Sequence, residues 1–107
     1  MTLQEFFAYK GKIVIHCPEY TQAKLLLSEF DALGKTWVNK QRYITYDNWE
    51  DYGDETCYTN DGHYSGLSYF RSEGYTIILS DAIDIMPNDT QLTTDGLLSK
   101  FNELMNL

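Results

Sequence analysis

Short apolar runs separated by turn-forming residues predict several strands. Runs rich in β-branched or aromatic side chains, which strands prefer, occupy residues 12–17, 35–38, 56–59, 63–65 and 75–79. Pro18 closes the first run, and Asn60-Asp61-Gly62 is a typical hairpin turn between the third and the fourth. The pattern therefore predicts four to five short strands.

Two segments have the apolar spacing of amphipathic helices. Residues 19–33 place apolar side chains three and four positions apart, and Gly34 follows where helix C-termini favour glycine. This stripe consists of Ala23, Leu26, Leu27, Phe30 and Leu33. Near the end of the chain, residues 94–105 repeat the spacing with Leu97, Leu98, Phe101, Leu104 and Met105. Each segment predicts a helix.

Shorter helical signals occur at three further places. Thr2-Leu3-Gln4-Glu5 fits a capping box and predicts a short N-terminal helix. Residues 47–53 and 67–73 each predict about one turn of helix, ended by a glycine.

These elements together predict the fold class. We expect one α+β domain over residues 1–107, with a small mixed or antiparallel sheet of four to five short strands and two to three helices. Because strand 12–17, helix 19–33 and strand 35–38 follow one another, the fold is expected to begin β-α-β.

Charge changes the picture of which partner fits this domain. Eight basic and sixteen acidic residues give a formal net charge of −8 at pH 7. Residues 1–42 hold six basic and four acidic residues, whereas residues 43–107 hold only Arg71 and Lys100 against twelve acids. Direct binding of nucleic acid requires a basic surface that releases phosphate counterions. We therefore expect an acidic face and no direct nucleic-acid partner.

Sequence features also bear on where the protein acts. No stretch approaches the ~20 consecutive apolar residues of a membrane span, and the first residues lack the basic and apolar regions of a signal peptide. Two cysteines, Cys17 and Cys57, do not make the disulfide framework of a small secreted domain. These features predict a cytoplasmic protein without a membrane partner.

Motifs of the common catalytic classes are missing from the sequence. It contains no G-x-S-x-G, Walker A or G-x-G-x-x-G pattern, and no pair among its sixteen acids is singled out as acid and base. We expect a binding protein without catalytic residues.

Zinc is the one cofactor that the residue types suggest. The chain's cysteines and histidines, the ligands that zinc prefers, are His16, Cys17, Cys57 and His63. The Asn60-Asp61-Gly62 turn would bring Cys57 and His63 together, near the end of the first strand. Adjacent His16 and Cys17 point to opposite sides of a strand, so only one of them would ligate easily. The alternative is a buried Cys17 that acts as a small apolar residue, with two surface histidines.

An aromatic and acidic stretch in the middle of the chain is the candidate binding surface. Its aromatic residues are Tyr43, Tyr46, Trp49, Tyr52, Tyr58, Tyr64, Tyr69, Phe70 and Tyr75. Tyrosine and tryptophan dominate binding hot spots, and acids steer a basic partner to its site. The predicted partner-binding residues are Asp47, Trp49, Glu50, Asp51, Tyr52, Asp54 and Glu55. The alternative places half of the aromatic residues in the core, Tyr58 and Tyr75 among them.

Several short pieces in a fixed order carry a resemblance. They are Val14-Ile15-His16-Cys17-Pro18, the predicted helix through Ala23-Lys24, Leu33-Gly34-Lys35-Thr36-Trp37, Asn48-Trp49, Thr56-Cys57-Tyr58 and Glu73-Gly74-Tyr75-Thr76-Ile77-Ile78. Over about residues 10–80 the chain resembles a small open-reading-frame family of phages and prophages of Gram-positive bacteria.

That resemblance implies a function by analogy. Small acidic phage proteins include anti-CRISPR inhibitors, which bind an RNA-guided nuclease and block surfaces that are basic because they hold nucleic acid. The expected function is inhibition of a host nucleic-acid-handling protein by occlusion, with a type II CRISPR nuclease as the leading target. The alternative is a phage-internal interaction or regulatory module with no host target.

Overall fold

A computed structural model describes residues 1–84 and confirms an α+β fold. The helices are α1 (Leu3–Ala8), α2 (Tyr20–Ala32) and α3 (Leu67–Ser72), and the strands are β1 (Ile13–His16), β2 (Thr56–Thr59), β3 (Tyr64–Gly66) and β4 (Thr76–Leu79). Three 3-10 turns complete the description: η1 (Trp49–Asp51), η2 (Gly53–Glu55) and η3 (Ser80–Ala82). The helix predicted at residues 94–105 lies outside the described residues.

The four strands form one mixed sheet in the order β3-β2-β1-β4. β2 pairs antiparallel with both β1 and β3, whereas β4 runs parallel to β1. In this register Ile15 of β1 stands between Tyr58 of β2 and Ile78 of β4. The prediction of a small mixed sheet is therefore confirmed.

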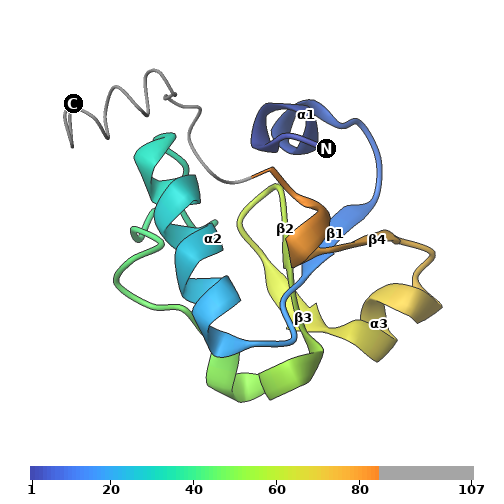
Figure 1. The fold of residues 1–107 in the computed structure, drawn as a ribbon. Helices are drawn as coiled ribbons and strands as arrows, with labels where there is room; N and C mark the ends of the chain where they lie inside the picture. The colour runs from blue at the N-terminus through green and yellow to red at the C-terminus, as the bar shows by residue number, and fades with distance from the viewer. Residues whose placement is uncertain (85–107) are drawn as a thin grey trace, which may run out of the picture.

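Helices cover the sheet on both faces, and β1 is buried between them. Figure 1 shows α2 and α3 on opposite sides of the sheet, with α1 at one end of it. Ile13 and Ile15 pack with side chains of α1 and α2, whereas Val14 packs with Leu67 and Phe70 of α3. Burial on both faces explains why β1 reads as a continuous apolar run rather than as an alternation.

Local signals in the sequence set the helix ends. The Thr2 hydroxyl accepts the Glu5 amide and the Glu5 carboxylate accepts the Thr2 amide, which confirms the capping box of α1. At the end of α2, Gly34 has φ +81°, and the amides of Gly34 and Lys35 donate to Asp31 and Phe30. These two bonds form a Schellman motif, which needs a left-handed residue.

The predicted β-α-β beginning is not found in that form. Helix α1 precedes β1, and residues 35–38 do not form a strand: Thr36 makes only an isolated bridge to Arg42, and a turn begins at Val38. Buried Trp37 explains the turn, because its indole donates to the Tyr46 carbonyl at 2.8 Å and its ring lies 4.6 Å from that of Tyr43. Tertiary packing of one aromatic ring therefore overrides a local preference for strand.

Candidate functional site

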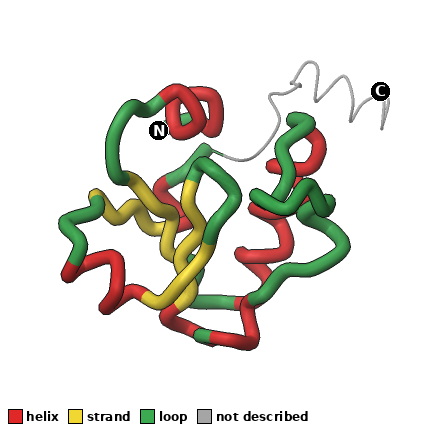
Figure 2. The backbone as a smooth tube through the Cα atoms, turned by 180° about the vertical axis from the view of Figure 1, so that it is seen from behind, coloured by secondary structure: helices red, strands yellow, loops and turns green. Residues whose placement is uncertain are grey.

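Residues 47–55, called the acidic segment below, connect the long loop after α2 to the start of β2. Figure 2 shows this loop leaving α2 and running into the short turns η1 and η2. The exposed members of the segment are Glu50, Asp51, Tyr52, Asp54 and Glu55. The predicted helical turn is thus found as two 3-10 turns, and the acids lie at its surface.

Side chains from the sheet hold the backbone of the acidic segment. The Tyr58 hydroxyl donates to the Asp47 carbonyl at 2.7 Å, and the His16 ring donates through Nε2 to the Asp54 carbonyl at 2.7 Å. The Thr56 hydroxyl lies 2.7 Å from the Gly53 carbonyl. These contacts satisfy backbone groups that a short irregular segment leaves unpaired, so they fix its path.

Two tyrosines also hold carboxylates of the segment. The Tyr20 hydroxyl donates to Asp47 Oδ2 at 3.0 Å, and the Tyr64 hydroxyl donates to Asp51 Oδ2. The bond to Asp51, with partial burial, raises the pKa of Tyr64 to about 12. The acidic segment is therefore held in place by the protein itself, before any partner arrives.

The segment's acids keep their charge uncompensated within residues 1–84. In this part of the chain the ion pairs are Arg42–Asp31, at 2.7 Å, and His63–Asp61, at 3.1 Å. Neither pair includes an acid of residues 47–55. Five carboxylates on one fixed segment, none of them in an ion pair within residues 1–84, make a concentrated negative surface.

Trp49 lies differently from the other predicted binding residues. Its indole donates to the Cys17 carbonyl at 2.9 Å, and its ring packs 5.5 Å from that of Tyr20 and against the core. Tyr52, in contrast, is 45% exposed. The geometry makes Trp49 an anchor of the segment and leaves Tyr52 as its accessible aromatic side chain.

The alternative that places aromatic residues in the core is confirmed for Tyr58 and holds in part for Tyr75. Tyr58 is fully buried on β2, whereas Tyr75 is only partly buried, packed against the cluster of Val14 and Phe70.

A pocket beside the acidic segment was not predicted from the sequence. It measures about 230 Å³ and is lined by Trp37, Val38, Tyr46, Asn48 and Tyr64 among others. Val38 and Tyr46 are each more than half exposed, at 59% and 58%. In the sequence, apolar residues within an otherwise polar loop could have indicated this pocket. The prediction of a strand at residues 35–38 instead assigned those side chains to the sheet.

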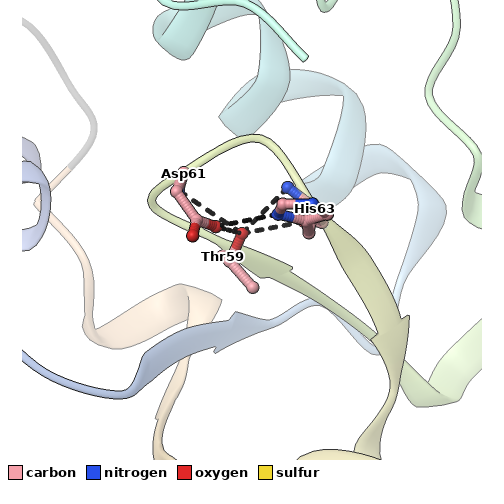
Figure 3. Close-up of polar contacts among 3 residues, drawn as sticks. All are labelled: Thr59, Asp61 and His63. Carbon is pink, nitrogen blue, oxygen red and sulfur yellow. Dashed lines mark hydrogen bonds and ion pairs between the residues drawn. The ribbon is translucent and has the colours of Figure 1, made fainter. Parts of the chain in front are cut away.

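The tip of the β2–β3 hairpin holds a compact polar cluster. Figure 3 shows Thr59, Asp61 and His63 turned toward one another. The Thr59 hydroxyl donates to Asp61 Oδ1 at 2.5 Å, and His63 Nδ1 lies 3.1 Å from the same oxygen. These bonds hold the pKa of Asp61 below its ordinary value. Thr59 is bonded to the acid rather than to the histidine ring, which is the arrangement of a capped turn and not of a nucleophile with its base.

The structure does not bring the four candidate zinc ligands together. Cys17 and Cys57 are buried in clusters on opposite faces of the sheet, while His16 donates to Asp54 and His63 belongs to the hairpin tip. Within the described part of the chain, no three side chains of His, Cys, Asp or Glu lie close enough to hold a metal ion.

Both thiols should be unreactive in the folded protein. Burial raises the pKa of Cys17 and of Cys57 to about 12. Because the thiolate is the reactive species, labelling by a disulfide reagent at about pH 8 should be about a thousandfold slower than for an exposed cysteine. Absorbance of the released thiolate measures the rate, and protein unfolded in urea is the control. Fast labelling of either thiol in the native state would contradict the burial seen at β1 and β2.

Comparison with protein-family models, curated proteins and solved structures finds no match for this chain. Among residues 1–84, no helix has the length and apolar character to cross a membrane.

Proposed function

We propose that this protein is a phage-type inhibitor that binds a basic surface of a host nucleic-acid-handling protein and blocks it by occlusion. The leading target is an RNA-guided type II CRISPR nuclease in the host cytoplasm. One observation carries the proposal: the acidic segment presents carboxylates that form no ion pair within residues 1–84, on a backbone fixed by Tyr58, His16 and Thr56.

Rigidity matters because a binding surface that is already ordered loses less conformational entropy on association. Carboxylates that form no ion pair with the described part of the chain offer a basic partner the charge that its nucleic acid would otherwise supply. They also speed the encounter of the two proteins, and salt weakens this effect. Exposed Tyr52, Tyr46 and Val38 add apolar contacts beside the charge.

Affinity purification tests the proposal directly. The bait is the full chain with a tag at its C-terminus, because the Met1 amino group donates to the Ala82 carbonyl at 3.4 Å. The lysate comes from a Gram-positive host with an active type II CRISPR system, and mass spectrometry identifies the bound proteins. Near-stoichiometric recovery of the nuclease, followed by loss of DNA cleavage when the protein is added, is the expected result. Recovery of phage proteins alone would instead favour a phage-internal module.

Charge neutralisation in the acidic segment gives a second prediction. Glu50→Gln, Asp54→Asn and Glu55→Gln together should lower affinity for the captured partner about 10- to 100-fold, mainly through slower association. The side chains of these three acids accept no hydrogen bond within residues 1–84, so the fold should not change. Surface plasmon resonance at about 0.05 and 0.5 M salt measures both rates, and the difference from wild type should shrink at high salt.

A matched variant controls for net charge alone. Glu29→Gln, Asp81→Asn and Asp84→Asn remove the same number of acids outside the segment and should bind like the wild type. Equal losses in the two triple variants would show that total charge, and not the segment, attracts the partner.

A further inference from the structure

A second groove lies between the tip of the β2–β3 hairpin and α3. It measures about 400 Å³ and is lined by Asp61, Tyr64, Tyr69, Phe70 and Tyr75 among others. Tyr64 borders this groove, while its ring packs against Trp37 on the other face of the sheet and its hydroxyl donates to Asp51 of the acidic segment.

Three aromatic rings form a continuous wall of the groove. The ring of Phe70 lies 5.2 Å from that of Tyr69 and 4.8 Å from that of Tyr75, both in edge contact. Phe70 is buried, whereas Tyr69 is 51% exposed. Buried Phe70 therefore holds two tyrosines in place at an accessible surface.

The groove combines these rings with negative charge. The side chain of Asp61 is 70% exposed, and its bonds from Thr59 and His63 hold the pKa of this carboxyl below its ordinary value, so that it stays ionised at neutral pH. The lining includes no lysine or arginine. His63 also lines the groove and lies 3.1 Å from one oxygen of this carboxylate. Aromatic walls beside a carboxylate are suited to a positively charged group.

The protein's own Lys12 shows that the wall attracts a cation. Lys12 Nζ lies 5.7 Å from the centre of the Tyr75 ring and donates to the Glu73 carbonyl at 3.0 Å. An ammonium group on the outer part of this wall is thus part of the folded structure. The rest of the wall, at Tyr69, has no cation over it among the described residues.

We propose that this groove is a recognition site for one arginine side chain of the partner protein. A planar guanidinium can stack on the exposed Tyr69 ring and direct its N–H groups at the Asp61 carboxylate, whereas a compact ammonium offers no plane to stack. The inference rests on the proposed function for the partner, and it adds that the partner presents an arginine beside the surface that meets the acidic segment.

A nuclear magnetic resonance titration tests the site without any host protein. The full chain, labelled with nitrogen-15, is titrated with acetyl-Gly-Arg-Gly-amide and, separately, with the same peptide carrying citrulline, which keeps the shape of arginine and lacks its charge. The arginine peptide should shift the amides of Ser65, Tyr69 and Tyr75 with a Kd of about 1 to 10 mM. The citrulline peptide should leave them unmoved.

Variants separate the groove from the acidic segment. Tyr69→Leu keeps an apolar side chain and should raise the Kd at least about fivefold at unchanged Tm, because the ring face is lost. The triple variant of the acidic segment should bind the peptide as the wild type does. Shifts confined to residues 47–55, an equal response to citrulline, or no shift at about 50 mM peptide would overturn the proposal. A failed host purification with a positive titration would reject the proposed target but retain the groove.

Discussion

Replacing Gly62 by alanine should lower the free energy of unfolding by about 4 kcal/mol. Gly62 has φ +91°, in the left-handed region that favours glycine. An added Cβ would stand 2.5 Å from the Val38 amide nitrogen and 2.9 Å from the Trp37 carbonyl carbon. Both are backbone atoms, which cannot rotate aside as a side chain can. The hairpin tip would have to move away from the loop after α2.

Gly34→Ala is the matched control for backbone strain. Gly34 also has a positive φ, +81°, but a Cβ added there would meet no atom within 4 Å. Its substitution should cost only about 1 kcal/mol. Urea denaturation of the two variants gives the free energy of unfolding of each. Their difference separates the cost of the close backbone contact from the cost of a positive φ. Equal losses would contradict the contact between the hairpin tip and residues 36–38.

Removing the indole of Trp49 should have the second largest effect. Trp49→Ala should cost about 3 kcal/mol, because it removes ring packing on Tyr20 and the core and also leaves the Cys17 carbonyl without its donor. Trp49→Phe keeps most of the packing and should cost about 1 kcal/mol. Thermal unfolding followed by circular dichroism gives both values.

Partner binding by the same two variants decides what Trp49 does. If its indole anchors the segment, Trp49→Phe should bind the captured partner within about threefold of wild type, while Trp49→Ala should bind about tenfold more weakly. If the indole instead contacts the partner, both variants should lose affinity by similar factors. Tyr52→Ala is the comparison for a side chain that is exposed in the free protein.

Elements with their own end signals could be predicted from the sequence. The capping box at Thr2 and Glu5, the glycine after α2, and the turn between β2 and β3 each act within a few residues, so their chemistry is readable without tertiary structure. The apolar stripe of α2 was likewise correct for its four buried members, whereas Leu33 lies at the helix end and is 45% exposed.

The loop after α2 could not be predicted in this way. Residues 35–38 have strand-forming side chains, but the indole of Trp37 finds its acceptor at Tyr46 and its ring neighbours at Tyr43 and Tyr58. Those contacts depend on the position of β2 in the folded protein, which no local sequence pattern specifies. The pocket that Trp37 and Tyr46 line was missed for the same reason.

The candidate site shows a similar division. The acids of residues 47–55 were found because charge can be counted along the chain, and all of them except half-buried Asp47 are exposed. The inward turn of Trp49 was not foreseen, because a half-buried indole and an exposed one look alike in sequence. The zinc ligands were proposed from residue type alone. In the strand register His16 is the cross-strand partner of Cys57, whereas Cys17 packs on the other face of the sheet.

The place of β1 in the sheet also governs how the chain can fold as it leaves the ribosome. Val14 of β1 pairs with Thr59 of β2 and with Ile77 of β4, both made long after it. Met1 and Thr2 in turn contact Asp84 through a backbone bond and an isolated bridge. A nascent chain therefore carries β1 without either of its neighbouring strands for much of synthesis, although α1 and α2, which cover one of its faces, are already made. Such long-range pairing is slow, so we expect folding in milliseconds to seconds, and only once β2 and β4 are both available to pair with β1.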